Sequence, residues 1–494
     1  MGAPLTATPA ASGWGERVVI AGAGFRLVDK LAVLYLALPV ALFFVQWFKP
    51  WFGLPLALAS LAGLPYLLPL RAEGDDLPGR TLAVAAAVAA VWTLLSGAGH
   101  FFYANYYDWH VRDAVLRDLA VMPAPATYRI EDGVATILRA PVAYYVLPGL
   151  LGRLAGVRYA DGFLCLWTFA GTLLFLLQVM AGERRWRSLA LVATAVVLFS
   201  GMDILGNRSS PFDITSHKEW WAGLFQYSSD TTLLFWVPNH ALPGWLAIAL
   251  IYRCRDDGKF LAIAAWLGAL TLLWAPLVSI GLLPFFGALA WRSFRRGSFC
   301  KLLSAPNLLA GPVVAAGAAI YVTIAAKSIA GHDFGPLPWW PQAVIYCQFV
   351  LIEFLALCLL LARDLKDGIE PFYFGTAVAV LLVLPLFKFG PNNDLVMRAS
   401  IPALAAVMFA VVDGWARPVR ILAPNALVTI LLAIGALTPA SEIARALFWP
   451  NWEPRLDRSV DDATGGSSPN YLAELKPGSL AATLLRAPVI ATGP

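Results

Sequence analysis

Charged residues are scarce in this 494-residue chain. Lysine, arginine, aspartate and glutamate together make up 14% of it, whereas a soluble domain carries roughly 25%. Hydrophobic residues make up 59%, which excludes a soluble globular enzyme and a disordered chain. The hydrophobic residues come in blocks of about 20, long enough for a helix to cross the hydrocarbon core. The alternating strands of a membrane β-barrel are absent, so the sequence predicts an all-α polytopic membrane protein.

The motifs of soluble catalysis are missing as well. The chain has no GxxxxGK[ST] phosphate loop, no HExxH zinc motif and no nucleophile elbow, which argues against an ATP-driven pump. It has no basic patch for a nucleic-acid partner. Its five cysteines form no CxxC pair and no Cys/His cluster. They are expected to be small buried side chains.

Fourteen hydrophobic windows are candidate transmembrane segments. Short gaps between them, such as 181–187 and 292–301, are rich in lysine and arginine, and this bias places them in the cytoplasm. The bias holds along the whole chain only if one candidate does not cross. The best choice is 141–155, because it is short and Pro148-Gly149 interrupts it. The windows are 31–47, 51–70, 81–99, 141–155, 162–180, 188–204, 233–251, 260–273, 275–291, 307–326, 342–362, 371–387, 396–413 and 421–437.

We therefore expect about thirteen crossings in a bacterial inner (plasma) membrane, with a cytoplasmic N-terminus and an extracytoplasmic C-terminus. The transmembrane domain comprises 1–437 and includes two long outer loops, 100–140 and 205–232. Residues 438–494 form either a small ordered cap or a loose extension on the outer face.

The first outer loop contains a pattern typical of an amphipathic helix. Asp108 is a suitable N-cap residue. After it, Trp109, Leu116 and Leu119 mark an apolar side. The pattern predicts a helix that lies at the lipid surface.

Two acid-then-base pairs follow on the same helix at i, i+4 spacing. They are Asp108 with Arg112 and Asp113 with Arg117. One interpretation is that these charges form only the solvated face of the helix. The other is that one carboxylate points into a cavity and acts as a general base.

Several polar residues gather in and around the second outer loop. His217, Glu219 and His240 could bind a metal, but a single HxE is a weak signal and hard cations need more carboxylates. We therefore expect no cofactor and regard a divalent metal as the less favoured alternative. The polar residues that could line a ligand site here are Asp203, His217, Glu219, Asp230 and His240.

Three more charged residues stand in or beside hydrophobic windows. Arg398 lies one turn inside its window, where it either pairs with Asp394 at i−4 or binds a phosphate through its planar guanidinium. Glu353 lies in the middle of a window. Such a residue is a functional candidate, or it donates or accepts a hydrogen bond with a neighbouring helix.

The order of these features is similar to that of the membrane-embedded C-type glycosyltransferases (the GT-C fold). The resemblance covers roughly residues 100–180. It is carried by the helix from Asp108 to Leu119, by Pro141 with Tyr144-Tyr145, and by Gly-Arg-Leu-Ala-Gly at 152–156. A single proline replaces the family's pair, and Trp109 stands where the family often has glutamate. Segments around Glu219, His240 and Arg398 also resemble a group of bacterial multi-pass membrane proteins.

This resemblance implies the inverting transfer of a sugar from a polyprenyl-phosphate (or diphosphate) donor to a glycan, lipid or protein acceptor at the outer face. Asp108 would be the general base toward the acceptor, and Asp113 its backup. Arg398 or Arg112 would hold the lipid phosphate as leaving group. The other expected substrate-binding residues are Asp203, His217, Glu219, His240 and Asp394.

Two other classes of function remain open at this point. One is a transporter or flippase of lipid-linked sugars, which Glu353 and Arg398 favour. The other is a polysaccharide polymerase or ligase of another membrane fold. The glycosyltransferase hypothesis requires that Asp108, His240 and Arg398 converge in one pocket.

Overall fold

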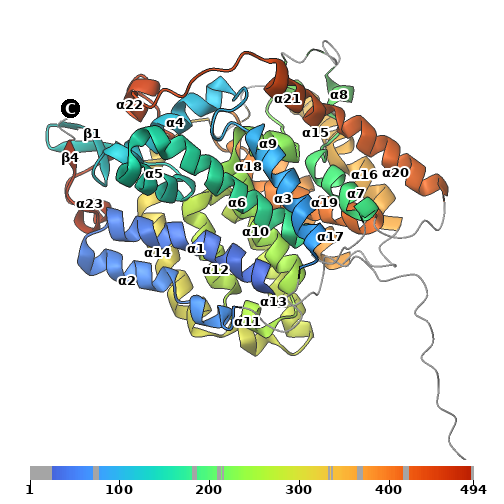
Figure 1. Ribbon diagram of the computed structural model, residues 1–494, viewed down its shortest axis with the longest axis horizontal. Helices are drawn as coiled ribbons and strands as arrows, with labels where there is room; N and C mark the ends of the chain where they lie inside the picture. Colours follow the sequence, from blue (N-terminus) through green and yellow to red (C-terminus); the bar gives the residue numbers. More distant parts are fainter. Residues whose placement is uncertain are drawn as a thin grey trace, which may run out of the picture.

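Apolar helices make up most of this protein, and they pack around one another in several directions (Figure 1). The computed structural model describes residues 25–70, 77–180, 186–207, 213, 216–331, 334, 338–363, 371–415 and 422–490. It is 71% helical and 4% strand. The expectation of a mostly helical chain is therefore confirmed.

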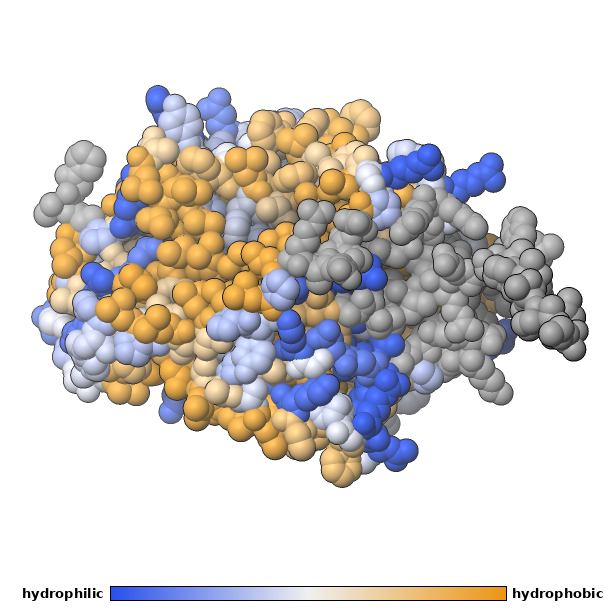
Figure 2. Space-filling view, turned by 60° about the horizontal axis from the view of Figure 1, so that its bottom comes forward, coloured by the Kyte–Doolittle hydropathy of each residue, from blue (hydrophilic) through white to orange (hydrophobic). Residues whose placement is uncertain are grey.

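Seven helices are long and apolar enough to cross a membrane, and five further apolar helices are shorter. The long ones coincide with half of the fourteen hydrophobic windows. They are Leu27–Trp47, Pro50–Leu67, Val157–Met180, Pro276–Arg295, Trp339–Leu361, Asp394–Asp413 and Ala426–Phe448. Figure 2 shows a broad apolar surface over one face of the molecule, with hydrophilic side chains gathered at its borders. A surface of this kind is suited to lipid contact.

The first half of the chain contributes twelve α-helices among its described residues. The longest, α1 and α6, are apolar on nearly all sides, which is typical of buried or membrane-spanning helices. The bounds are α1 Leu27–Trp47, α2 Pro50–Ser60, α3 Gly79–Leu94, α4 Tyr106–Val121, α5 Ala143–Ala155, α6 Ala160–Met180, α7 Trp186–Val197, α8 Asp203–Gly206, α9 Asp230–Trp236, α10 Pro238–Cys254, α11 Gly258–Leu261 and α12 Ala264–Trp274.

The second half continues with helices that are often interrupted. A π-helical turn at Leu351–Leu355 separates α15 from α16 and contains Glu353. The bounds are α13 Pro276–Arg295, α14 Gly311–Val322, α15 Trp339–Val350, α16 Ala356–Leu361, α17 Pro371–Val383, α18 Asp394–Ala399, α19 Ile401–Trp415, α20 Leu422–Gly435, α21 Leu437–Phe448, α22 Val460–Ala463 and α23 Leu480–Leu484.

A four-stranded sheet joins the first outer loop to the C-terminal segment, which an all-α prediction did not include. Strands β1 (Ala126–Glu131) and β2 (Val134–Leu138) form a hairpin. Its Asp132-Gly133 turn has two positive φ angles, as the favoured two-residue hairpin turn requires. Strand β3 (Leu472–Leu475) pairs with β2, and β4 (Val489–Ile490) pairs with β1. The C-terminal segment is therefore an ordered cap rather than a loose extension.

Both ends of α5 lie at the end of the helix bundle that carries this sheet. Just before α5, the amide of Ala140 donates to the hydroxyl of Tyr321 (3.2 Å), whose ring packs on Trp47 at the end of α1. At the other end of α5, Arg153 donates to the carbonyl of Leu119 near the end of α4 (2.9 Å). Whether residues 141–155 cross the membrane, and the number of crossings, stay predictions.

The opposite end of the bundle is held by a buried ion pair. Arg253 at the end of α10 donates to Asp29 in the first turn of α1 (2.7 Å), and Gln178 at the end of α6 donates to the same carboxylate (3.1 Å). Asp256 nearby pairs with Arg292 (3.0 Å). The short basic gaps after α10 and at the end of α13 therefore meet at this end.

Candidate functional site

Helix α4 is fixed in place by one buried tryptophan. The Trp109 indole donates to the carbonyl of Phe235 at the end of α9 (2.7 Å). A Cβ atom at Gly97 would lie 2.0 Å from the Trp109 ring, so this position has room only for glycine. Asn105, not Asp108, is the N-cap, because its side chain accepts a hydrogen bond from the Asp108 amide (3.3 Å). The prediction that Asp108 is the N-cap is therefore wrong, because the cap lies about one turn earlier in the helix.

The predicted pair of Asp108 and Arg112 is confirmed. Arg112 donates to the Asp108 carboxylate (3.0 Å), to the Asn239 carbonyl oxygen (2.7 Å) and to the Tyr145 hydroxyl (3.2 Å). The Arg112 side chain is 4% exposed, whereas that of Asp108 is 28% exposed. The guanidinium is thus held rigidly by three elements, while the carboxylate keeps an accessible oxygen.

Helices α10 and α18 bring further charges to the same place. His240 interacts electrostatically with both Arg398 and Arg112, and Asp394 interacts with both Arg398 and Asp108. Asp108, His240 and Arg398, which are far apart in the sequence, are therefore linked electrostatically through Arg112 and Asp394. We call this set, with Arg112 and Asp394, the Asp108 cluster.

Three members of the Asp108 cluster have unsatisfied polar groups, and one of these groups is the buried Nε of Arg112, which has no hydrogen-bond partner. The Nδ1 atom of His240 is buried without a hydrogen-bond partner. In the part of the chain that the structure describes, the Arg398 guanidinium makes no hydrogen bond and no ion pair within 4.0 Å. The predicted ion pair between Asp394 and Arg398 is therefore absent there. A half-buried guanidinium with no such bond is well suited to bind a phosphate.

The loop before α18 is shaped to present these residues. Asn393 adopts a left-handed conformation with a φ of 55°. Its side-chain amide donates to the carbonyl of Leu224 (3.0 Å), and its side-chain oxygen accepts from the amide of Phe389 (3.3 Å). These bonds anchor the start of α18 and so position Asp394 and Arg398.

Three residues of the site were not identified from the sequence. Asn239 and Tyr145 hold Arg112, as described above. Tyr471 interacts electrostatically with Arg112, Asp108, Arg398 and Asp394. Asn239 stands next to the predicted His240, and Tyr145 belongs to the motif that carries the family resemblance. No local signal marks Tyr471.

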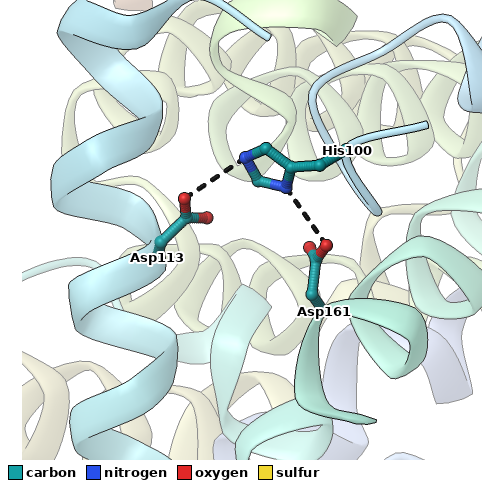
Figure 3. Close-up of side chains that lie close together, drawn as sticks. All are labelled: His100, Asp113 and Asp161. Carbon is teal, nitrogen blue, oxygen red and sulfur yellow. Dashed lines mark hydrogen bonds and ion pairs between the residues drawn. The ribbon is translucent and has the colours of Figure 1, made fainter. Parts of the chain in front are cut away.

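Asp113 lies in a different cluster from Asp108. Its carboxylate is 3.2 Å from Nε2 of His100, and Nδ1 of His100 is 3.1 Å from Asp161 on α6 (Figure 3). The Asp113 side chain is 1% exposed. The predicted pair of Asp113 with Arg117 is wrong, because Arg117 instead contacts Asp118 (2.9 Å). Five residues correspond to roughly 140° around a helix, so the two aspartates face different sides.

The electrostatics of the His100 cluster favour a cationic imidazole. Burial lowers the pKa of His100, but hydrogen bonds to Asp113 and Asp161 outweigh this and raise it to about 10. Burial raises the pKa of Asp113 to about 6, although His100 opposes the shift. At neutral pH the imidazolium therefore lies between two carboxylates as a buried ion triplet.

His100, Asp113 and Asp161 are also the one set of three histidine, cysteine or acidic residues, among those the structure describes, that could hold a metal ion. Their candidate ligand atoms lie within 4.8 Å of one another. However, the imidazole stands between the carboxylates and points a different nitrogen at each (Figure 3). A metal would have to displace these contacts. His217, Glu219 and His240 do not form such a set, because His240 belongs to the Asp108 cluster.

His217 and Glu219 form a second buried network around Glu442 of α21. His217 contacts Glu442 (3.1 Å) and Glu219 (3.4 Å). Glu442 also accepts from Trp236 (3.0 Å) and Arg445 (2.9 Å). Burial lowers the pKa of His217, but the two glutamates outweigh this and raise it to about 9.

Asp203 lies near that network and accepts hydrogen bonds from Ser200 (3.1 Å) and Thr438 (3.0 Å). The intramembrane Glu353 accepts a hydrogen bond from Trp221 (2.9 Å), which is the structural alternative expected for it. The hydrogen bonds and ion pairs of the described residues do not join Asp203, His217 or Glu219 to the Asp108 cluster. A small hollow beside the Glu442 network is lined by no member of the Asp108 cluster; its lining residues are Tyr103, Asn105, Phe235, Trp236, Glu442, Arg445 and Ala446.

Comparison with known proteins identifies no relative. No family model, no curated protein and no solved structure matches this chain.

Proposed function

We propose that this protein is a membrane glycosyltransferase of GT-C-like architecture with about thirteen crossings. It moves a sugar from a polyprenyl-phosphate (or diphosphate) donor to an acceptor at the extracytoplasmic face of a bacterial inner membrane. The observation that carries this proposal is the Asp108 cluster, in which an accessible carboxylate pairs with Arg112, and Asp394 lies within electrostatic range of both Asp108 and Arg398.

The chemistry of the cluster suits glycosyl transfer with a phosphate leaving group. Asp108 accepts the proton of the acceptor O–H or N–H group while the acceptor atom attacks the anomeric carbon. The bond from that carbon to the phosphate oxygen breaks, and its electron pair stays on the phosphate. Arg112 and Arg398 stabilise the charge that develops there.

Preorganisation of the cationic side supports the same proposal. Arg112 is held by Asn239 and Tyr145 (2.7 and 3.2 Å) before any substrate arrives, so little reorganisation accompanies charge development. His240 and Asp394 lie near the arginines and are proposed to contact the sugar or the phosphate.

The remaining predicted residues take supporting roles in this proposal. Asp113 is buried and contacts His100, which helps to fix α4 in place. We therefore do not assign it the role of a second base. Asp203, His217 and Glu219 belong to hydrogen-bonded networks behind the hollow. They are proposed to affect the sugar and the acceptor indirectly, through the residues that line that hollow.

The test uses the purified full-length protein in liposomes with polyprenyl phosphate that carries radiolabelled sugars, offered as a panel. A membrane extract supplies the acceptor. We expect the label to leave the lipid fraction while free polyprenyl phosphate appears. Asp108→Asn should lower this transfer on the order of 10²-fold or more without loss of expression, whereas the exposed hairpin variant Asp132→Asn should not change it.

Two results would count against the proposal. Turnover of Asp108→Asn close to that of the wild type would remove Asp108 from the mechanism. Movement of an intact lipid-linked sugar across the bilayer, with no cleavage, would favour the flippase alternative.

A further inference from the structure

We propose that Tyr471, from the C-terminal segment, is a substrate-binding residue of the Asp108 cluster. Its hydroxyl donates a hydrogen bond to the phosphate group that Arg112 and Arg398 bind. This inference rests on the proposed function and adds the C-terminal segment to the site.

The backbone on both sides of Tyr471 is fixed. Its carbonyl accepts from the amide of Arg139, directly after β2 (2.7 Å), and its amide donates to the carbonyl of Ser468 (3.0 Å). Leu472, the next residue, pairs with Leu138 in the sheet. Main-chain hydrogen bonds therefore fix the position of Tyr471, and the phenol ring extends from an anchored segment.

The surroundings of Tyr471 are the charges of the proposed site. The phenol interacts with both arginines and with both aspartates, Asp108 and Asp394. These residues come from α4 and α18, so Tyr471 lies within electrostatic range of both helices. A hydroxyl in this position can reach an anion that lies between the arginines.

The hydroxyl of Tyr471 is also free to bind a ligand. Among the described residues it has no hydrogen-bond partner, and the side chain is half-buried. Several other half-buried or buried tyrosines of this protein do have one. Tyr128 donates to Asp118 (2.8 Å), Tyr227 to the carbonyl of Leu381 (2.6 Å) and Tyr346 to that of Leu382 (2.9 Å). Buried phenols usually find such a partner, so the hydroxyl of Tyr471 is available to donate to a ligand.

The test measures the binding of polyprenyl monophosphate, without a sugar, to the purified full-length protein in detergent. Tyr471→Phe removes only the hydroxyl and keeps the ring. We expect its Kd to rise about tenfold, which corresponds to about 1.4 kcal/mol. Tyr159→Phe, at an exposed tyrosine bonded only to Arg158 among the described residues, serves as the matched control and should bind like the wild type.

The outcomes separate this inference from the proposed function. If the wild type binds and Tyr471→Phe binds equally well, Tyr471 is not a ligand contact while the proposed site stands. If the wild type does not bind, the proposed function itself fails. A second measurement needs no variant: polyprenyl monophosphate should protect Tyr471, but not Tyr159, from nitration in the wild type. Equal nitration of Tyr471 with and without the lipid would also overturn the inference.

Discussion

At the scale of single residues, the two aspartates of α4 differ in burial, and they are therefore suited to different roles. Asp108 keeps 28% of its side chain exposed and faces the arginines, whereas Asp113 is 1% exposed and contacts His100. A buried carboxylate needs a compensating charge, and His100 supplies it. The accessible one is available to take up a proton from a bound acceptor.

The His100 cluster predicts a loss of stability at alkaline pH. The pKa of His100 is raised from 6.5 to about 10 in the folded protein. Its contribution is therefore fully present below about pH 6.5 and is lost as the pH rises toward 10. We expect the midpoint of thermal unfolding in detergent to fall over this range.

The variant His100→Gln should remove most of this alkaline slope, whatever its absolute stability. His110→Gln, on α4 and hydrogen-bonded only to the carbonyl of Tyr106 among the described residues, should keep the slope. An equal slope in all three proteins would show that the His100 triplet does not control the alkaline response.

At the scale of elements, the C-terminal cap is attached to α4 by one carboxylate. Asp118 accepts from the amide of Val460 at the start of α22 (2.8 Å), from the hydroxyl of Tyr128 in β1 (2.8 Å) and from Arg117 (2.9 Å). It thereby joins α4, the sheet and the C-terminal segment. Because Tyr471 lies in the same segment, this attachment also supports the proposed site.

Replacement of Asp118 by alanine should weaken the docking of the C-terminal segment. The methyl group cannot accept the bonds that Val460 and Tyr128 donate to the carboxylate, which costs about 1–3 kcal/mol. We expect faster hydrogen exchange at the Val460 amide and faster proteolysis in the segment after α21. Asp457→Ala, at an exposed site in the same segment, is the control, and exchange as slow as in the wild type at Val460 would refute the attachment.

At the scale of the whole molecule, two polar ends lie on either side of an apolar body. One end carries the sheet, the Asp108 cluster and the C-terminal cap. The other carries the buried pair of Asp29 and Arg253 and the pair of Asp256 and Arg292. The lysine and arginine bias predicts that this second end faces the cytoplasm.

A reporter fused after residue 494 should therefore read as extracytoplasmic. The physical reason is that β4 pairs with β1 of the first outer loop, so both must lie on the same side. A fusion after Arg296, in a short basic gap, should read as cytoplasmic. Because β1 and β4 are paired, a cytoplasmic reading after residue 494 would place the whole sheet in the cytoplasm and reverse the side assigned to the site.

Some features of this protein follow from local patterns in its sequence. The apolar helices and their approximate ends could be predicted because hydrophobic burial and backbone hydrogen bonding in a membrane act along one segment at a time. The pair of Asp108 and Arg112 could be predicted because i, i+4 spacing brings side chains together on any helix. The convergence of Asp108, His240 and Arg398 was a hypothesis that needed the fold for support.

Only the tertiary structure decided the contacts between distant segments. Arg112 and Asn239 are 127 positions apart, and Asp118 and Val460 are 342 positions apart. Nothing in the local sequence around Tyr471 or Asp161 indicates its partners, because those contacts depend on how whole helices and strands pack. The sequence by itself determined what kind of protein this is and which helices it forms, whereas packing between remote elements determined which of its charged residues meet.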